Sequence, residues 1–298
     1  MIAPKSLGLA MAAHNAQDSI MKALNSVRQQ GNFFSEVVVV DDGSTDNTYE
    51  ILQGIKQGMP ILKIIKQENL GPAFARNRAF SELSSTWLTY LDADDILADD
   101  YVEKMNSLVA DYEDFDVFMP NGLRIAPCGD RQIYRELSQP HIVTFEEMVV
   151  GCQTISAGSL MRKSTWDKYG GFDQRYPQAQ DYDLWLRMLI GGERLVMSPE
   201  PVYLYFTKPS SVSANPMRNL CSTKTILSNI AKEQEISSSQ KGLIKRVVRD
   251  KSLRIFLAMP VEALRKLLQP ILGDRGNDFF FKMYTSAATS KRKLAGSK

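Results

Sequence analysis

Short apolar runs alternate with amphipathic helical patterns over the first 120 residues, and this alternation constrains the fold more than any other feature. The expected strands cover residues 7–12, 37–41, 61–66, 87–91 and 116–120, and the expected helices cover residues 17–30, 46–57, 73–84 and 99–110. The run Val37–Val40 is β-branched throughout, as expected for a strand buried on both faces. Strands and helices that alternate at this interval predict βαβ units, and therefore an α/β fold whose mainly parallel sheet carries helices on both faces.

The pattern becomes mixed after residue 120, and the composition changes after Ser213. The middle of the chain predicts helices at residues 144–151, 164–169 and 181–190, and strands at residues 157–162 and 199–206. Residues 214–298 hold 17 Lys and Arg against 6 Asp and Glu, whereas residues 1–213 hold 19 against 28. We therefore expect one α/β domain over residues 1–213 and a basic helical extension with a mobile end over residues 214–298.

The basic extension contains two helical patterns, Leu243–Leu257 and Val261–Leu268, and the second follows Pro260. This second pattern combines apolar and basic side chains, namely Leu264, Leu267 and Leu268 with Arg265 and Lys266. Such a stripe either packs against its own domain or attaches peripherally to an anionic membrane, and the sequence leaves both alternatives open. Nucleic-acid binding is not expected, because the basic residues are not interleaved with stacking aromatic side chains.

The composition excludes several classes of protein. A chain of 298 residues with 44% hydrophobic residues can bury a large core, which excludes a disordered protein. No apolar run reaches the roughly 18 to 20 residues that span a bilayer. Cys128, Cys152 and Cys221 have neither paired spacing nor a nearby histidine, which favours free thiols over disulfides or a zinc site. We expect a cytoplasmic protein, with or without contact to the inner face of the cell membrane.

Two acidic clusters follow two of the expected strands. VVVVDDGSTD contains Asp41 and Asp42 after its apolar run, and TYLDADD contains Asp92, Asp94 and Asp95. Ligands of open α/β sheets bind beyond the carboxyl ends of the strands, so both clusters should converge on one edge. Two carboxylates about 4 Å apart repel by roughly 4 kcal/mol at an effective dielectric of 20, so a cleft that holds them needs a cation. Such oxygen ligands suit Mg²⁺ or Mn²⁺ with substrate phosphates, although single members of each cluster could instead cap the next helix.

A third pattern, QAQDYDLWLRML, places Asp181 at the start of an amphipathic helix. The apolar face of this helix comprises Leu184, Trp185, Met188 and Leu189. Aspartate caps many helices, and the helix dipole favours its ionised form. An ionised carboxylate can also act as a general base, and the two roles do not exclude each other.

Four motifs in this order, DDGSTDNT, NLGPAFARNRA, TYLDADD and QDYDLWLRM, resemble those of the family 2 glycosyltransferases with the GT-A fold. The similarity covers about residues 5–213. It implies a Rossmann-like GT-A domain, a nucleotide-sugar donor with UDP favoured, a glycan or lipid-linked acceptor, and Mn²⁺ or Mg²⁺ as cofactor. The Gln-x-x-Arg-Trp signature of processive polysaccharide synthases is absent, so the resemblance is to the non-processive members.

The resemblance also implies roles for individual residues. Asp42 would accept a hydrogen bond from the nucleotide base, and His14 would stack on that base. Arg76 would contact the nucleotide or its diphosphate. Asp94 would bind the metal, and Asp92 would face the ribose or the metal. The implied nucleotide-binding set is Ala12, His14, Asn15, Asp42, Arg76, Asp92 and Lys208.

Two positions near the implied catalytic centre depart from the usual pattern of the family. Asp181 matches the catalytic base, but Gln180 precedes it where the family usually has Glu, which leaves open the acceptor contact made by that Glu. Lys208 stands where the family usually has a histidine, and a lysine could neutralise phosphate charge but could not ligate the metal while protonated. Only one base is apparent, so the resemblance implies a single displacement with inversion at the anomeric carbon.

Two other functions remain open on the sequence alone. The stretch DADDI resembles the Asp-x-Asp motif of phosphatases with an aspartyl nucleophile, in which Asp92 would be the nucleophile and Asp94 the acid. That interpretation leaves the other motifs unexplained. The non-enzyme alternative is a nucleotide-sugar-binding or scaffolding relative that has lost transfer activity, which the departures at His14, Gln180 and Phe206 make conceivable.

Overall fold

The computed structural model describes the whole chain except residues 1, 4, 152–153, 209–214 and 259–298. The chain forms two compact units, Met1–Val247 and Val248–Lys298, and each is considered by itself. The domain boundary expected after residue 213 stays a prediction. The amphipathic pattern at residues 261–268, and with it the expected membrane contact, lies outside the described residues.

A ten-stranded sheet with the order β3-β2-β1-β4-β9-β6-β10-β5 forms the centre of the first unit, with β7 paired to β6 and β8 to β10. The six longest strands are β1 (Leu7–Ala13), β2 (Phe34–Asp42), β3 (Leu62–Gln67), β4 (Trp87–Tyr90), β6 (Val117–Ile125) and β10 (Leu195–Phe206). The short strands are β5 (Ile96–Leu97), β7 (Arg131–Ile133), β8 (His141–Val143) and β9 (Leu160–Arg162). The α/β fold expected from the sequence is confirmed.

The six long strands all run in the same direction. β1 pairs in parallel with β2 and β4, and β2 pairs in parallel with β3. Because β9 is antiparallel to both β4 and β6, β6 has the direction of β4, and β10 is parallel to β6. The carboxyl ends of these strands therefore meet at one edge. The sheet is nevertheless mixed, since all four short strands are antiparallel to their neighbours.

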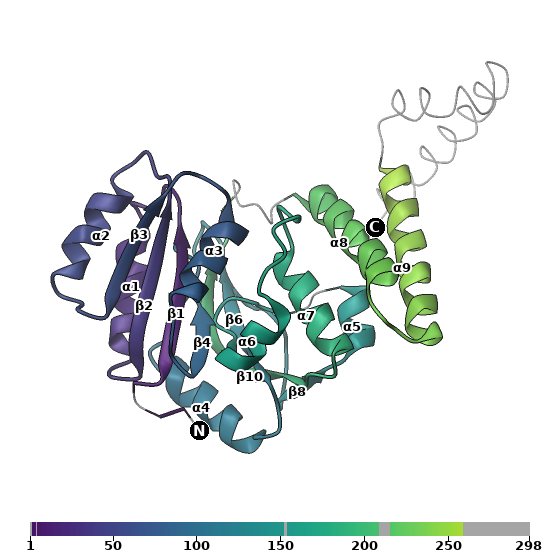
Figure 1. Cartoon of the computed structure of the whole chain (residues 1–298), viewed down its shortest axis with the longest axis horizontal. Helices are drawn as coiled ribbons and strands as arrows, with labels where there is room; N and C mark the ends of the chain where they lie inside the picture. Colours follow the sequence, from purple (N-terminus) through teal and green to yellow (C-terminus); the bar gives the residue numbers. More distant parts are fainter. Residues whose placement is uncertain (1, 4, 152–153, 209–214, 259–298) are drawn as a thin grey trace, which may run out of the picture. The chain divides into compact units, whose positions relative to one another are not determined.

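Helices cover both faces of this sheet, and α3 and α6 lie in front of the strands in Figure 1. The described helices are α1 (Ile20–Gln29), α2 (Thr48–Lys56), α3 (Pro72–Ser81), α4 (Tyr101–Asp111), α5 (Phe145–Val150), α6 (Lys163–Tyr169), α7 (Gln180–Ile190), α8 (Pro216–Glu233) and α9 (Ser238–Leu257). Phe80 of α3 stacks on Trp166 of α6, with ring centroids 3.8 Å apart. On the other side, Gln30 after α1 accepts a hydrogen bond from the N–H of Val102 in α4.

The core of the sheet follows from the sequence pattern. Val37–Val40 in β2 are all buried, as their continuous β-branched run predicts. Thr144 caps α5 through a capping box with Glu147, which fixes where that helix begins. Among the described residues, no helix combines the length and the apolar character needed to cross a bilayer. Cys128 and Cys221 are free thiols, as expected.

Several local features differ from the sequence-based expectation. Ala179, not Asp181, occupies the N-cap position of α7, and Asp181 lies in the first turn. Its Oδ1 accepts the N–H of the next residue, Tyr182, so the capping role considered for Asp181 is not observed. The strands β5, β7 and β8 have only two or three residues each, which is too short to leave a periodic signal in the sequence.

Candidate active site

The loops after β1 and β2 are joined by hydrogen bonds at the carboxyl edge of the sheet. The backbone N–H of Asn15 donates to Ser44 Oγ at 3.0 Å. Nδ1 of His14 lies 2.9 Å from the backbone oxygen of Asp42, and Nδ2 of Asn69 lies 3.3 Å from the same ring nitrogen. The His14 side chain is exposed. It is therefore oriented by the end of β2 and by the loop after β3, and its stacking on a nucleotide base stays a prediction.

The carboxylate of Asp42 fastens the loop that precedes α3. Its Oδ1 accepts hydrogen bonds from Gln67 Nε2 (2.7 Å) and from the N–H of Leu70 (2.9 Å), and its Oδ2 accepts from the N–H of Gly71 (2.9 Å). The residue is 3% exposed. A carboxylate offers about four acceptor positions, so these three donors leave one position for a ligand. Asp42 thus has a structural role that the sequence did not reveal, and its contact with a nucleotide base stays a prediction.

Arg76 on α3 links the second acidic cluster to α7. Its guanidinium forms an ion pair with Asp92 and lies over the ring of Tyr90, 5.4 Å from the centroid. Burial disfavours the charged guanidinium, but the nearby Asp92 and Asp181 raise the pKa of Arg76 above its ordinary value. The Nε–H of Arg76 is buried and has no acceptor among the described residues. This unpaired donor is an exception, because buried polar groups are rarely without a partner.

Tyr90, the last residue of β4, lies in the same electrostatic environment. Burial raises the pKa of its phenol well above the ordinary value, and the negative charge of Asp181 adds to this effect. The positive charge of Arg76 lowers the pKa of Tyr90, whereas the negative charge of Asp92 raises it. The charges of Asp92, Asp181 and Arg76 therefore act on one another at the carboxyl edge, although these residues are far apart in the sequence.

Lys208 follows β10 and forms an ion pair with Asp94. Its Nζ lies 3.1 Å from Asp94 Oδ2, and the two side chains are 47% and 39% exposed. Exposed ion pairs of this kind contribute about 0 to 1 kcal/mol. The pair can therefore open at little cost when a cation approaches the carboxylate or a phosphate approaches the ammonium group.

Asp95 fastens the end of β10 to the acidic loop. The hydroxyl of Tyr203 donates to its Oδ2 (2.8 Å), and the N–H of Phe206 donates to its Oδ1 (2.9 Å). Burial, together with the charges of Asp92 and Asp94, raises the pKa of Asp95 to about 8. Asp95 is therefore largely protonated near neutral pH, and the charges of Asp92 and Asp94 lie close enough to disfavour a third charge beside them.

Asp181 is presented by a strained turn and by a helix that is anchored to α5. Ala179, immediately before α7, has a φ of 57°, which lies in the left-handed region. A non-glycine residue in this conformation costs on the order of 1 to 3 kcal/mol and persists only where the surroundings impose it. The hydroxyl of Tyr182 donates to the backbone oxygen of Val149 in α5 at 3.0 Å. The position of the predicted base is therefore determined by packing on both sides.

The structure places the predicted site residues along one edge of the sheet. Asp42 ends β2, His14 and Asn15 follow β1, and Ala12 lies half-buried within β1. Five other predicted residues interact through ion pairs and charges, namely Arg76, Asp92, Asp94, Asp181 and Lys208. Sequence reasoning missed Gln67, Tyr90 and Tyr203, and it placed Asp95 in the acidic cluster without giving it a role of its own. The first two are the last residues of β3 and β4, a position that could have indicated them.

Asp92 and Asp94 are the candidate ligands for a divalent cation. Their carboxylates are 31% and 39% exposed. Within the described part of the chain, no group of three or more His, Cys, Asp or Glu side chains is arranged to hold a metal. Mg²⁺ and Mn²⁺ often bind through one or two carboxylates together with substrate phosphates and water. The two aspartates therefore fit such a cation when a phosphorylated ligand supplies the remaining oxygens.

Comparison with known proteins identifies the class of this site. The model of glycosyl transferase family 2 matches residues 9–159, which is just over half of the chain. The chain therefore belongs to glycosyltransferase family 2, and the resemblance drawn from the four motifs is confirmed. This membership leaves no support for the phosphatase alternative.

Curated relatives come from bacterial polysaccharide biosynthesis. The succinoglycan biosynthesis protein ExoU of Rhizobium meliloti (strain 1021) is 28% identical over 228 residues, which cover 72% of this chain and 65% of ExoU. The Escherichia coli protein WfaP, a UDP-Glc:alpha-D-GlcNAc-diphosphoundecaprenol beta-1,3-glucosyltransferase, is 27% identical over 224 residues, which cover 75% of this chain and 86% of WfaP. The chain thus spans a little under two thirds of the length of ExoU.

Solved structures show the same fold. Residues 1–349 of Staphylococcus aureus TarS in complex with UDP-GlcNAc have a TM-score of 0.69 and 18% identity, covering 89% of this chain and 81% of that one. The mannosyltransferase PcManGT from Pyrobaculum calidifontis, in complex with GDP-Man and Mn²⁺, has a TM-score of 0.63 and 15% identity, covering 100% of this chain and 90% of that one. The expected GT-A fold is thereby confirmed.

Proposed function

We propose that this glycosyltransferase transfers a sugar from a nucleotide diphosphate sugar, with UDP as the favoured nucleotide, to a hydroxyl group of a glycan or lipid-linked saccharide. The transfer is a single displacement that inverts the anomeric carbon, and Asp181 is the base. Relatives with UDP-Glc or UDP-GlcNAc in their names or complexes support the choice of nucleotide. The diphosphoundecaprenol-linked acceptor in the name of WfaP supports the acceptor class.

One observation carries this proposal: the partly buried Arg76 forms an ion pair with Asp92 and also lies in the electrostatic field of Asp181. A carboxylate that belongs to the acidic loop and a carboxylate on α7 are thus placed around one guanidinium. The side chain of Arg76 is 18% exposed, so its guanidinium can also meet a phosphate oxygen. A phosphate group and a proton acceptor are needed side by side when a hydroxyl displaces a nucleoside diphosphate.

The reaction follows from this arrangement. The carboxylate of Asp181 accepts the proton of the acceptor hydroxyl while the hydroxyl oxygen forms a bond to the anomeric carbon. The bond between that carbon and the diphosphate oxygen breaks, and the electron pair leaves with the nucleoside diphosphate. Arg76 and Lys208 supply positive charge to the leaving group. Asp92 and Asp94 would hold Mn²⁺ or Mg²⁺, which, when bound, further stabilises the charge of the leaving diphosphate.

The replacement Asp181→Asn tests the role of the base. Release of UDP from a panel of UDP-sugars, with and without saccharide acceptors, should fall by at least about 100-fold, since a general base contributes typically 10² to 10⁴ in rate. Thermal stabilisation by UDP with Mn²⁺ should be retained, because Asp181 is not a donor ligand in this mechanism. The control is Asp111→Asn, which changes an exposed carboxylate at the end of α4.

Two outcomes would contradict the proposal. If Asp181→Asn turned over donors at the rate of the unchanged protein, Asp181 would not be the base. If UDP with Mn²⁺ stabilised the protein but no donor and acceptor pair gave turnover, the non-enzyme alternative of a nucleotide-sugar-binding relative would be favoured.

A further inference from the structure

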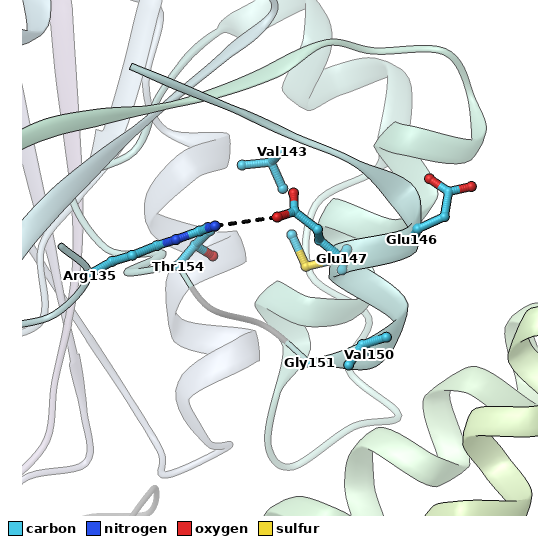
Figure 2. Close-up of a pocket in the computed structure, with 8 residues that line it drawn as sticks. Arg135, Val143, Glu146, Glu147, Val150, Gly151 and Thr154 are labelled. Carbon is cyan, nitrogen blue, oxygen red and sulfur yellow. Dashed lines mark hydrogen bonds and ion pairs between the residues drawn. The ribbon is translucent and has the colours of Figure 1, made fainter. Parts of the chain in front are cut away.

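A cavity of about 310 Å³ lies beside α5, away from the acidic loop. Its lining comprises Arg135, Val143, Glu146, Glu147, Met148, Val150, Gly151 and Thr154. Figure 2 shows the side chain of Arg135 reaching toward Glu147, with Val143 beside this pair and Glu146 on the outer side of the helix. The volume lies at the lower end of the roughly 300 to 1,000 Å³ typical of small-molecule sites. It suits a ligand the size of one or two sugar rings better than a whole nucleotide sugar.

The polar side of the cavity is a network in which charges are already balanced. Nη2 of Arg135 lies 3.3 Å from Glu147 Oε1 and 3.1 Å from His141 Nε2. The same His141 nitrogen lies 2.9 Å from Glu147 Oε2. The buried Asn121 of β6 donates to the backbone oxygen of Arg135 at 2.8 Å, which fixes the segment that presents the guanidinium. Hydrogen-bond donors and acceptors therefore lie side by side in this network, and its net charge is small.

The other side of the cavity is apolar. Val143 and Met148 are buried, whereas the side chain of Val150 is 60% exposed. A sugar ring has an apolar face of C–H groups and a rim of hydroxyls, each of which both donates and accepts hydrogen bonds. An apolar wall opposite a paired guanidinium and carboxylate matches this chemistry. A diphosphate, in contrast, would need uncompensated positive charge, and Arg135 is already paired with Glu147.

The cavity is connected to the helix that carries the proposed base. Val149, between the lining residues Met148 and Val150, accepts the hydroxyl hydrogen bond of Tyr182, the residue next to Asp181. Thr154, another lining residue, stands two positions before Ser156. Ser156 Oγ accepts a hydrogen bond from Trp185 Nε1 of α7 at 2.9 Å, and it also acts on the hydroxyl of Tyr90. The C-terminal part of α5 and Ser156 are thus both hydrogen-bonded to α7, the helix that carries Asp181.

We propose that this cavity is an acceptor subsite that holds a neutral sugar ring of a saccharide acceptor, at a distance from the hydroxyl that reacts. This inference rests on the proposed glycosyl transfer. It specifies which part of the acceptor the protein recognises. The sugar residue in the cavity directs the acceptor chain along the segment of residues 154–156 toward Asp181. The lipid or diphosphate part of a lipid-linked acceptor lies elsewhere.

Gly151 offers a way to fill the cavity without disturbing the fold. Its φ is 171°, which is extended backbone that any residue adopts, and a Cβ added there meets no atom within 4 Å. The test variant is therefore Gly151→Leu. The matched control is Gly54→Leu in α2, where an added Cβ also meets no atom within 4 Å and the residue is exposed.

Ligand-observed saturation-transfer NMR on the full chain measures binding of three probes: methyl β-D-glucoside, methyl β-D-galactoside and methyl N-acetyl-β-D-glucosaminide. At least one should bind to the unchanged protein and to Gly54→Leu in the presence of saturating UDP and Mn²⁺. Binding to Gly151→Leu should be weaker by at least about tenfold, because pocket contacts of one or a few methylene groups discriminate ligands 10- to 200-fold.

Several results would overturn the proposal. These are the absence of binding by all three glycosides, equal binding to Gly151→Leu, or displacement of the glycoside by UDP, which would place it in the donor site. Binding of geranyl diphosphate that depends on Gly151, without binding of glycosides, would assign the cavity to the lipid diphosphate instead.

The proposed function is measured separately in the same proteins. If UDP with Mn²⁺ failed to stabilise the unchanged protein but a glycoside bound and Gly151→Leu abolished this binding, the subsite would stand and the transfer reaction would not. If donor turnover depended on Asp181 but no glycoside bound, the transfer reaction would stand and the subsite would fall.

Discussion

The loops at the ends of β1, β2 and β3 differ in construction from the region around α5. At the ends of these strands, side chains bind the backbone of neighbouring loops, as Asp42 does with Leu70 and Gly71. Around α5, polar side chains bind one another, as Arg135 and Glu147 do, and they border an open cavity. A hydrogen bond to the backbone depends on one side chain only, whereas a bond between two side chains is lost when either of them is substituted. The first region therefore suits the constant nucleotide part of a donor, and the second suits a variable acceptor.

Paired aspartates at the end of β2 illustrate the first kind of construction. Asp41 Oδ1 accepts the N–H of Ser44 and so holds the turn that follows its own strand. Asp42 accepts from the loop after the neighbouring strand β3. The two carboxylates are thus assigned to different loops, which explains why one buried strand ends in two acids. Two N–H donors offset the cost of burying the charge of Asp42. Asp41 has the one donor of Ser44, and its Oδ2 is buried without a partner among the described residues.

The largest effect should come from removing the proposed metal ligand of the donor region. Asp94→Ala should abolish the thermal stabilisation that Mn²⁺ adds to UDP and should reduce donor turnover by about 100-fold or more, a loss typical when a charge-stabilising group is removed. Differential scanning fluorimetry and UDP release measure the two effects. Glycoside binding in the α5 cavity should be unchanged. An unaltered Mn²⁺ dependence would exclude Asp94 as a ligand.

A smaller effect is expected from the loop anchor of the same region. Asp42→Asn leaves one acceptor oxygen for donors that now use two, so at least one N–H near Leu70 or Gly71 loses its partner. Leaving a buried group unsatisfied costs about 1 to 3 kcal/mol. The melting temperature should therefore fall by roughly 2 to 12 °C, at about 2 to 4 °C per kcal/mol for a domain of this size. Asp111→Asn is the control, and a melting temperature unaffected by Asp42→Asn would show that the anchor is dispensable.

A modest effect is expected where α8 contacts the segment before the base. Glu233 of α8 accepts two hydrogen bonds from Arg175, at 3.0 and 2.9 Å, and Asn229 of α8 donates to Tyr176. Because these side chains hold the segment that leads to Asp181, the double variant Asn229→Ala and Glu233→Gln should lower kcat while the KM of the donor stays constant. The expected decrease is about two- to tenfold, since exposed ion pairs contribute about 1 kcal/mol or less.

Glu235→Gln, which changes an exposed acid after the end of α8, is the control for this pair. A fall in kcat of the same size in the control, or a change confined to the KM of the donor, would argue against a role of α8 in positioning the base.

The smallest effect is expected for the acceptor region and depends on pH. Burial alone would raise the pKa of Glu147, but His141, Thr144 and Arg135 hold it below its ordinary value. Its ionised form therefore stabilises the fold above the ordinary pKa of glutamate, and this contribution is lost as the pH falls through the lowered pKa. Glu147→Gln should lower the melting temperature slightly at pH 6, and the difference from the unchanged protein should shrink toward pH 3. A difference that grew on acidification would contradict this assignment.

The sequence predicted the loops at the ends of β1, β2 and β3 better than the region around α5, and particular residues show why. The run Val37–Val40 predicts a buried strand, and the acids that follow it predict a binding site at the end of that strand. Both signals lie within one short stretch. Glu147 and Arg135, in contrast, are recognisable only from their contacts with other strands. Glu147 contacts His141 of β8, and the backbone oxygen of Arg135 accepts a hydrogen bond from Asn121 of β6. The sequence offered no reason to single out either residue, because strands of three residues leave no periodic signal.

By itself, the sequence determined the α/β class, the family and the residues at the strand ends, because burial periodicity and strand-end chemistry are local properties. Only the tertiary structure decided that Asp181 and Asp92 act on the same Arg76, that Asp42 anchors a neighbouring loop, and that a cavity opens beside α5. These features depend on distances between segments far apart in the chain. Such distances are fixed by strand order and helix packing, not by any one stretch of residues.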